Sequence, residues 1–351
     1  MIHSIRLQQY RSYNDDSFEF DKRVNIIVGP NASGKTNLLE ALTVVCQGKS
    51  YKAPDHELVQ HDAEWARIDS QSDEHSRIVK LKHDTVTTHK HIEIDKNTYT
   101  RLSYQKQLPY VLFEPNDLRM LHGGPERRRD YIDGLLERLY VPFGKLRREY
   151  RRTLAQRNKQ LKSGRTTEDD LFVWDVRLSE IGNTIAEQRQ QLIEGISPKL
   201  TAIYQEIAHS AVTVTFAYQT SCNSANYGSS MLKLLKDNVQ RDVERGFTTY
   251  GPHRDDIAIT FDGYAAKEVA SRGETRTVVL ALKILELELL KAHIDSKPLL
   301  LLDDVFSELD GARRKHLTEY LQSYQTFITT TDADIVVKHF TKNSHIIALD
   351  R

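Results

Sequence analysis

The stretch Gly29 to Thr36, GPNASGKT, constrains the fold of this 351-residue chain more than any other segment. The apolar run Val24 to Val28 precedes it, and Asn37 to Gln47 follows with a helical pattern. Glycines in such a turn let backbone N–H groups point at phosphate oxygens, and the helix start adds a favourable dipole. A glycine-rich turn that ends in Lys-Thr by chance is the alternative, which the flanking strand and helix disfavour. The pattern predicts an α/β fold with a phosphate-binding loop made of Gly29, Pro30, Asn31, Ala32, Ser33, Gly34, Lys35 and Thr36.

A second apolar run, PLLLLDDVFSELD from Pro298 to Asp310, carries acidic residues where it ends. Four leucines bounded by a proline and by charge are typical of a central strand covered on both faces. Clustered carboxylates repel one another and resist desolvation, so a cation is needed to hold them together. The phosphate loop suggests that this cation is magnesium bound to a nucleotide.

These two segments together predict the chemistry of one site. Lys35 is placed to contact the β- and γ-phosphates of ATP, while the Thr36 hydroxyl and the Asp303 carboxylate are expected to ligate magnesium. Asp304 follows directly and is expected to polarise a water for attack on the γ-phosphate. Glu308 and Asp310 could instead cap the turn that follows the strand.

The composition is that of a globular protein, with 39% hydrophobic and 28% charged residues. The sequence has no run of about eighteen apolar residues and no apolar segment typical of a signal peptide near its N-terminus, so we expect a cytoplasmic protein without membrane contact. Cys46 and Cys222 lack the spacing of metal ligands, and a disulfide scaffold is not expected. The length favours two lobes over a single core.

A second candidate anion site lies before the late strand. Ser271, Arg272 and Gly273 precede an amphipathic helical pattern that continues to His293. A Ser-x-Gly segment at the start of a long helix can bind an anion. An ordinary serine helix cap would be the preferred interpretation if this segment stood alone.

The order of these motifs resembles an ABC-type ATPase head of the SMC kind, and more narrowly the RecF family of bacterial recombination-repair proteins. The narrower resemblance depends on VLFEPNDLRMLHGGPERRRDYID from Val111 to Asp133, QRN at 156–158, YGPHRDD from Tyr250 to Asp256 and DDVFSELD from Asp303 to Asp310. These stretches extend over essentially the whole chain.

The resemblance implies an ATP-dependent homodimer in which the signature of one subunit caps the γ-phosphate held by the other. Ser271, Arg272 and Gly273 would then act in trans, and the segment from Ser307 to Asp310 resembles the D-loop that crosses the dimer interface. Arg11 matches an arginine that approaches the nucleotide in such heads, although an ordinary surface arginine remains a competing interpretation.

Several residues depart from the pattern of the family. Glu274 and Thr275 replace glutamines after the signature glycine, and Ala32 replaces a glycine, a change that is tolerable if its backbone angle is ordinary. Asp304 replaces the glutamate of wider ABC heads, so we expect slow hydrolysis. Where transporter ATPases carry a switch histidine, this chain has Thr330, Thr331 and Asp332, so we expect a hydroxyl to sense the γ-phosphate.

The middle of the chain is expected to form an antiparallel helical hairpin. Apolar residues follow helical spacing between 127 and 162, with a break near Pro142, and again beyond Thr167. Helices of this length reach only about 30 to 60 Å, far less than the arms of SMC proteins. We therefore expect an ATPase head, 1–120 with 246–351, and a mostly helical second lobe, 121–245. Residues 51–110 are expected to add a small antiparallel sheet.

Positive charge is concentrated on the expected hairpin. The segment from Arg127 to Arg165 has thirteen Lys and Arg against four Asp and Glu, a balance of +9 in a chain whose net charge is zero. Few acids are spaced to pair with these cations, which favours contact with a DNA backbone over a solvated helix face. The candidate DNA-binding residues are Arg147, Arg148, Arg151, Arg152, Lys159 and Lys162, with Arg157 and Arg165 in the same cluster.

The favoured hypothesis is an ATP-switched clamp on duplex DNA. The resemblance further implies action at gapped DNA and help in loading the RecA recombinase with RecR and RecO partners. The ATPase subunit of a membrane transporter is the alternative, but it leaves the basic hairpin unexplained. An ATPase-coupled nuclease would need a further domain after the head. The segment from Gly251 to Asp256 could line the active site or form a turn.

Overall fold

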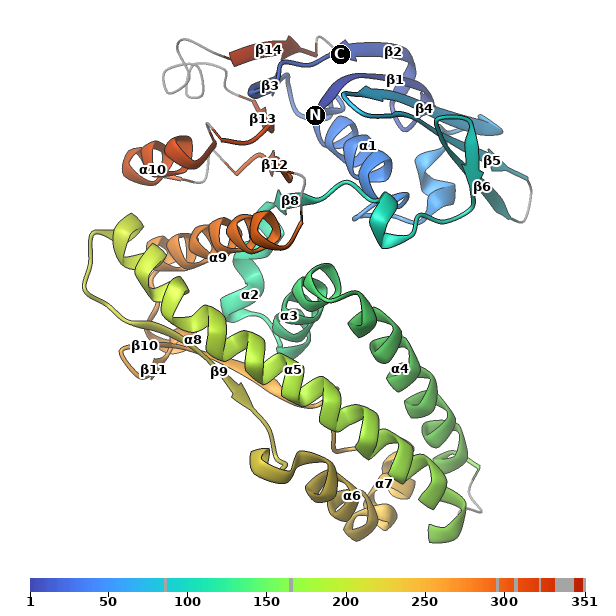
Figure 1. Ribbon diagram of the computed structural model, residues 1–351, viewed down its shortest axis with the longest axis vertical. Helices are drawn as coiled ribbons and strands as arrows, with labels where there is room; N and C mark the ends of the chain where they lie inside the picture. The colour runs from blue at the N-terminus through green and yellow to red at the C-terminus, as the bar shows by residue number, and fades with distance from the viewer. Residues whose placement is uncertain are drawn as a thin grey trace. The chain divides into compact units, whose positions relative to one another are not determined.

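The computed structural model describes residues 1–84, 87–163, 167–294, 297–305, 309–321, 323–331 and 344–349 (Figure 1). It divides into two compact units, of which unit 1 comprises Met1–Asp117 with Glu286–Arg351 and unit 2 comprises Leu118–Leu285. The second boundary falls within helix α9 (Arg272–His293). The predicted ATPase head resumes at residue 246, earlier in the chain than unit 1 does. The division into an ATPase head and a helical second lobe stays a prediction.

Unit 1 contains a five-stranded parallel sheet in the order β14-β3-β13-β12-β8. Its strands are short, and all five residues of both β12 and β13 are buried, as expected of parallel strands covered on both faces. The apolar run of four leucines is therefore a central strand, as predicted. The bounds are β3 Val24–Val28, β8 Tyr110–Phe113, β12 Leu299–Asp303, β13 Thr326–Thr330 and β14 Ser344–Ala348, with helix α10 at Gly311–Leu321.

A six-stranded antiparallel sheet forms the other part of unit 1, in the order β2-β1-β4-β5-β6-β7. Its strands alternate buried and exposed side chains, the pattern of a sheet with one face on a core. The antiparallel strands predicted within residues 51–110 are present as β4 to β7, and β1 and β2 extend them to a sheet of six strands. The bounds are β1 Ile2–Tyr10, β2 Tyr13–Glu19, β4 Trp65–Ser72, β5 Ser76–His83, β6 Thr88–Ile94 and β7 Asn97–Tyr99, with single 3-10 turns η1 Asp55–Leu58, η2 Tyr104–Lys106 and η3 Pro115–Leu118.

Helix α1 (Lys35–Gln47) contacts both sheets and is buried from Leu38 to Cys46 without interruption. Apart from Glu40 and Thr43 the residues of this stretch are apolar, and such a helix needs cover on every side, which the two sheets provide. Arg77 on β5 is 3% exposed, and its Nη1 donates to the carbonyl of Val45, 3.4 Å away, in the last turn of α1. A cation at the C-terminus of a helix is favourable, so this contact helps to fix the helix that follows the phosphate loop.

Unit 2 is mostly helical, with α4 and α5 paired side by side (Figure 1). At 1.5 Å per residue the 21-residue α4 extends about 30 Å and the 41-residue α5 about 60 Å. Thr167 caps α5 through a reciprocal pair of hydrogen bonds with Asp170. The predicted helical hairpin is therefore present. The bounds are α2 Arg119–His122, α3 Pro125–Leu139, α4 Val141–Leu161, α5 Glu168–Ala208, α6 Tyr227–Asp237, α7 Val239–Arg245 and α8 Ala266–Val269, with η4 Ser224–Asn226 and a small sheet of β9 Val214–Gln219, β10 Asp256–Phe261 and β11 Tyr264–Ala265.

Arg157 is a buried structural residue, which corrects its placement in the surface cluster of cations. Its side chain is fully buried and donates to Asp175 at 2.5 Å and to Asp242 at 2.6 Å. These carboxylates lie on α5 and α7, so one guanidinium joins three helices of unit 2. The sequence could not show this, because a buried cation inside a basic run has the same local sequence pattern as its exposed neighbours.

The segment from Gly251 to Asp256 is also held by side chains from distant parts of unit 2. Asp255 accepts hydrogen bonds from the hydroxyls of Tyr218, at 2.5 Å, and Tyr227, at 2.7 Å. His253 Nδ1 lies 2.8 Å from the hydroxyl of Tyr150 on α4. The segment is therefore an anchored connection, since its acidic and imidazole groups are engaged by the fold.

His253 makes the stability of the fold depend on pH. Burial lowers the pKa of this histidine to about 4, while the unfolded chain has an ordinary histidine pKa of about 6.5. Between those values the unfolded state binds a proton that the native state does not, so stability is present above pH 6.5 and is lost as pH falls toward 4. We expect this residue alone to lower the free energy of unfolding by about 2 kcal/mol between pH 7.5 and pH 5.

Urea unfolding of wild type and His253→Gln at the two pH values measures this contribution. Because glutamine does not titrate, the variant should lose about 2 kcal/mol less than wild type over the same interval. Equal losses in the two proteins would contradict a neutral, buried His253.

Candidate nucleotide-binding site

The phosphate loop lies at the carboxyl edge of the parallel sheet. Strand β3 ends at Val28, the loop follows, and α1 begins at Lys35. On neighbouring strands of the same sheet, β13 ends at Thr330 and β12 at Asp303. The fold therefore brings the loop and the acidic strand end together, because parallel strands present their carboxyl ends at one edge.

Two residues of the loop have left-handed backbone conformations. Gly34 has a φ of 98°, and a Cβ there would lie 2.9 Å from both the Ser12 and Tyr13 hydroxyl oxygens. Ala32 has a φ of 68°. The condition under which alanine would be tolerable at this position, an ordinary backbone angle, is therefore not met. Alanine occupies a conformation that favours glycine and that costs about 1 kcal/mol or more for an L-residue.

Lys35 is directed into the loop. Its Nζ donates to the carbonyl oxygens of Gly29 at 2.8 Å and of Pro30 at 2.7 Å. Burial lowers the pKa of the ammonium group, and the charges of Asp304 and Asp303 partly offset that effect. A phosphate oxygen would give this buried cation the counter-charge that two neutral carbonyls do not.

Thr36, Asp303 and Thr329 form a hydrogen-bonded cluster beside the loop. Asp303 Oδ1 accepts from the hydroxyl of Thr36 at 2.9 Å and from that of Thr329 at 2.8 Å. Proteins usually bind magnesium through one or two carboxylates together with phosphate oxygens and water. The facing hydroxyl and carboxylate suit such an ion. Among the described residues, no group of three or more His, Cys, Asp and Glu is placed to hold a metal by itself.

Asp304 has a strained backbone with a φ of 52°, and its N–H donates to the Thr329 hydroxyl at 2.9 Å. Left-handed conformations of residues other than glycine are costly and are frequent at functional sites. Thr329 thus supports both aspartates, a role that the sequence analysis missed because it pointed to Thr330 and Thr331. Thr330 is buried and Thr331 exposed, while Asp332 lies outside the described residues.

Glu40 on α1 is a second residue that the sequence analysis missed. It is 1% exposed and accepts two hydrogen bonds from the Arg11 guanidinium, at 2.8 and 2.9 Å. The Ser50 hydroxyl donates to it at 2.5 Å, and the neighbouring Tyr51 hydroxyl lies 3.5 Å from Asp303 Oδ2. The buried Glu40 carboxylate, on the helix that follows the phosphate loop, therefore holds both Arg11 and Ser50, the residue before Tyr51.

The signature segment lies in unit 2, at the start of α9. The Ser271 hydroxyl accepts from the Glu274 N–H at 3.2 Å, and the Ser271 N–H donates to the Glu274 carboxylate at 2.8 Å. This is a capping box. It gives Glu274, a departure from the family pattern, a local role. Thr275, the other departure, is buried, and its hydroxyl contacts the Ser271 carbonyl at 3.0 Å and His122 Nε2 at 3.1 Å.

Comparison with known proteins agrees with this geometry. The family model for the RecF/RecN/SMC N terminal domain matches residues 1–349. The DNA replication and repair protein RecF of Alkaliphilus oremlandii is 34% identical, with 94% of this chain and 93% of that protein covered. The RecF protein of Moorella thermoacetica is 33% identical, with 100% of this chain and 95% of that protein covered. The chain belongs to the RecF family.

Solved structures extend the likeness to three dimensions. A structure described as the recombination mediator protein RecF-ATP in the RecFOR pathway has a TM-score of 0.83 and 30% identity, and covers 94% of this chain and 92% of that one. An Smc head bound to the C-winged helix domain of ScpA has a TM-score of 0.54 at 15% identity and shows the fold alone. The chain is thus a RecF-family DNA replication and repair protein with an SMC-like ATPase head. The transporter alternative has no support in these comparisons.

The D-loop expected in a RecF-family head is only partly described. Ser307 lies outside the described residues. Asp310 is half-exposed and caps α10, because its Oδ1 accepts from the Arg313 N–H at 3.0 Å. The cap fits the helix-capping alternative, and the D-loop role stays a prediction.

No helix among the described residues is both long and apolar enough to cross a membrane.

The candidate DNA-binding cations on α4 have different surroundings. Arg147 is 22% exposed and pairs with three carboxylates, Asp130, Asp133 and Glu137. The other five are exposed, and no ion pair within the described part of the chain involves them. These five are Arg148, Arg151, Arg152, Lys159 and Lys162.

The buried ion pair at Glu40 gives a measurable stability difference. Glu40→Gln should lower the free energy of unfolding by about 3 kcal/mol, because it leaves the Arg11 guanidinium half-buried without its carboxylate. Glu57→Gln is the matched control, since Glu57 lies 3.9 Å from the same guanidinium but is 52% exposed. The control should cost less than about 1 kcal/mol in urea unfolding. Similar losses in both variants would show that Glu40 is not the principal partner of Arg11.

Proposed function

We propose that this RecF-family chain is an ATP-switched clamp on duplex DNA, in which ATP closes a homodimer and slow hydrolysis releases it. The observation that carries the proposal is the cluster of Thr36, Asp303 and Asp304 beside Lys35 at one sheet edge. A relative solved with ATP and similar over nearly the whole chain supports the same ligand.

Each residue of the cluster has a role in this proposal. Gly29 to Gly34 present backbone N–H groups to the phosphates, and Lys35 exchanges loop carbonyls for phosphate oxygens. Thr36 and Asp303 hold magnesium, which when bound neutralises charge on the β- and γ-phosphates. Asp304 orients and polarises the attacking water as general base. Arg11, fixed by Glu40, contributes positive charge on the nucleotide side of α1.

A second copy completes each nucleotide site. Ser271, Arg272 and Gly273 reach the γ-phosphate held by the partner, where the start of the 22-residue α9 favours an anion. Ser307 and Asp310 belong to the segment that crosses the interface. The capping box of Ser271 keeps its hydroxyl at the helix start, where it can meet a phosphate.

Duplex DNA binds to the exposed cations of α4. Arg148, Arg152 and Lys159 recur at helical spacing and Lys162 is the C-cap of the same helix, so the four lie along one side over about 20 Å. Such a stripe suits a line of phosphates and carries no base readout. Arg147 instead anchors α4 to α3 through its three carboxylates.

The cellular setting follows the family. The chain acts in the cytoplasm at gapped DNA and works with RecR and RecO mediators to help load RecA. The solved relative is described as part of the RecFOR pathway, which supports these partners.

Asp304→Asn should separate binding from hydrolysis. The amide keeps the size of the carboxylate but is a poor base, so the variant should bind ATP and remain dimeric for longer than wild type. Sedimentation velocity with ATP and magnesium measures the dimer, and Lys35→Ala by itself is the control that should neither bind nucleotide nor form a homodimer. An Asp304→Asn protein that stays monomeric with saturating ATP would contradict the proposed switch.

The α4 stripe predicts a specific salt dependence. Replacing Arg148, Arg152 and Lys159 with alanine should weaken ATP-dependent duplex binding and reduce the slope of log K against log salt by roughly 2 to 3. The control removes three exposed cations elsewhere in unit 2, Lys199, Lys233 and Arg241, and should leave the slope unchanged. Fluorescence anisotropy with a labelled duplex measures both. Equal effects of the two triple variants would rule out a local DNA site on α4.

A further inference from the structure

The start of α9 contains the two residues that depart from the family pattern, Glu274 and Thr275, and both of them hold Ser271. The Ser271 N–H donates to the Glu274 carboxylate at 2.8 Å, and the Ser271 hydroxyl oxygen accepts from the Glu274 N–H at 3.2 Å. The Ser271 carbonyl accepts from the Thr275 N–H at 2.9 Å and from the Thr275 hydroxyl at 3.0 Å. Each polar group of Ser271 is therefore engaged by one of these two residues.

The Ser271 hydroxyl can still donate a hydrogen bond. A hydroxyl has one hydrogen to donate, and its oxygen can accept at the same time. Since the oxygen accepts from Glu274, the hydrogen is available for a phosphate oxygen. Ser271 is also exposed, as a residue that meets the nucleotide of a partner copy must be. Where that hydrogen can point depends on how firmly the backbone of Ser271 is held.

His122 on α2 completes this arrangement. Its Nε2 lies 3.1 Å from the hydroxyl oxygen of Thr275. The Thr275 hydroxyl has a single hydrogen, and the Ser271 carbonyl can only accept it. Both contacts are satisfied together only if the imidazole has its hydrogen on Nε2 and donates to Thr275. His122 therefore acts as a donor that sets the direction of the Thr275 hydroxyl.

Arg128 on α3 fixes the short helix that carries His122. Its Nη1 donates to the carbonyl oxygens of Met120, at 3.3 Å, and Gly123, at 2.7 Å, within and directly after α2. Its Nε and Nη2 donate to the two carboxylate oxygens of Asp256 on β10, at 2.8 and 2.9 Å. A helix of four residues is too short to be stable by itself. Arg128 thus gives His122 a rigid support.

We propose that His122 is a positioning residue for the signature, which through the Thr275 hydroxyl holds Ser271 in the orientation that meets the γ-phosphate bound to a partner copy. Thr275 is 4% exposed, so water does not readily replace the imidazole as donor. This inference rests on the trans role of the signature in the proposed function and names the residues that orient it. It also gives Thr275 a role, because its hydroxyl accepts from His122 and donates to Ser271.

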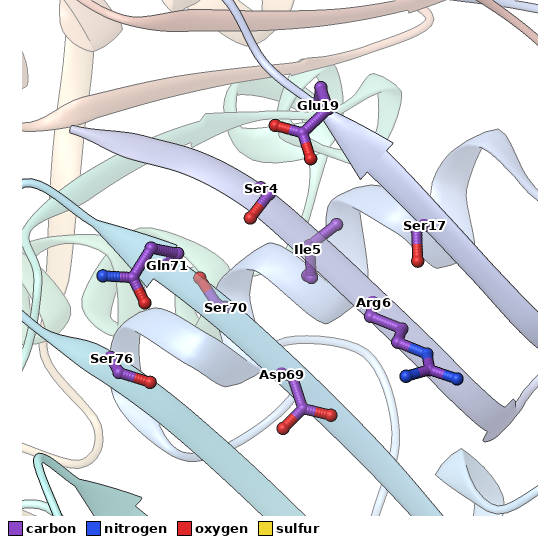
Figure 2. A pocket seen from close by; sticks show the side chains of 9 residues that line it. All are labelled: Ser4, Ile5, Arg6, Ser17, Glu19, Asp69, Ser70, Gln71 and Ser76. Atoms are coloured by element: carbon purple, nitrogen blue, oxygen red, sulfur yellow. The ribbon is translucent and has the colours of Figure 1, made fainter.

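A hollow on the outer face of the six-stranded sheet of unit 1 offers a matched control. Figure 2 shows Gln71 there, near Ser4 and Arg6. The Gln71 side-chain N–H donates to the Ser72 carbonyl at 3.4 Å, and the Arg6 guanidinium is neutralised by both carboxylate oxygens of Asp15. Gln71→Leu therefore removes an exposed side-chain donor from a part of unit 1 that has no role in the proposed function.

The test measures the ATP concentration at which half of the protein is dimeric, by sedimentation velocity with magnesium. His122→Phe keeps a planar ring but has no N–H, so it should need roughly three- to tenfold more ATP than wild type. His122→Gln places an amide N–H near the position of Nε2 and should stay within about twofold of wild type. Gln71→Leu should behave as wild type.

A second measurement separates the signature from the phosphate loop. Binding of a fluorescent ATP analogue, at protein concentrations too low for the dimer, should be the same in wild type and in each His122 variant. His122 is exposed, so its variants should also unfold in urea as wild type does. A loss confined to dimerisation is the result expected of a positioning residue.

A double-mutant cycle tests whether His122 acts through Thr275. Thr275→Val removes the hydroxyl and nearly keeps the shape, so it should cost about as much as His122→Phe. Both changes together should add less than about twofold to the loss from either one.

Unchanged dimerisation of His122→Phe, equal losses in His122→Phe and His122→Gln, or additive losses in the cycle would each overturn the proposal. A wild type that stays monomeric with saturating ATP would overturn it together with the proposed switch. ATP-dependent dimers that are indifferent to His122 would overturn this inference alone.

Discussion

The hydrogen bond between the Thr36 hydroxyl and the Asp303 carboxylate, 2.9 Å long, joins residues 267 positions apart and sets the organisation of the rest of unit 1. It requires the phosphate loop and the late strand to end at the same sheet edge. A buried strand that ends in two aspartates is costly unless a cation sits there. The phosphate loop before α1 resolves this, since a magnesium nucleotide bound there would supply the missing positive charge.

Helix α1 links this edge of the parallel sheet to the rest of unit 1 by packing. It is buried between the parallel and antiparallel sheets, and Glu40 in its middle holds Arg11 and Ser50. Arg77 fixes its last turn. A nucleotide that moved the start of α1 would therefore act on both sheets, because a packed helix moves as a rigid element.

Sequence alone was enough for the phosphate loop, the acidic strand, the helical hairpin and the family, because each depends on local pattern. It was insufficient where partners lie far apart in the chain. Arg157 and Arg147 read as surface cations, but carboxylates from other segments surround them. Glu40 and Thr329 carry no motif of their own, and the left-handed angle of Ala32 cannot be read from its side chain. The roles of Ser271 and Asp304 stay predictions for the same reason, because they depend on a second copy and a bound nucleotide.

The central claim is that each copy completes the nucleotide site of its partner, and mixing two inactive variants tests it most directly. Lys35→Ala disables the phosphate loop, and Ser271→Arg disables the signature. In a two-fold dimer, mixed pairs contain one site with both parts intact, so equal mixing should restore roughly a quarter of wild-type ATP hydrolysis. A mixture no more active than either variant alone would contradict the account.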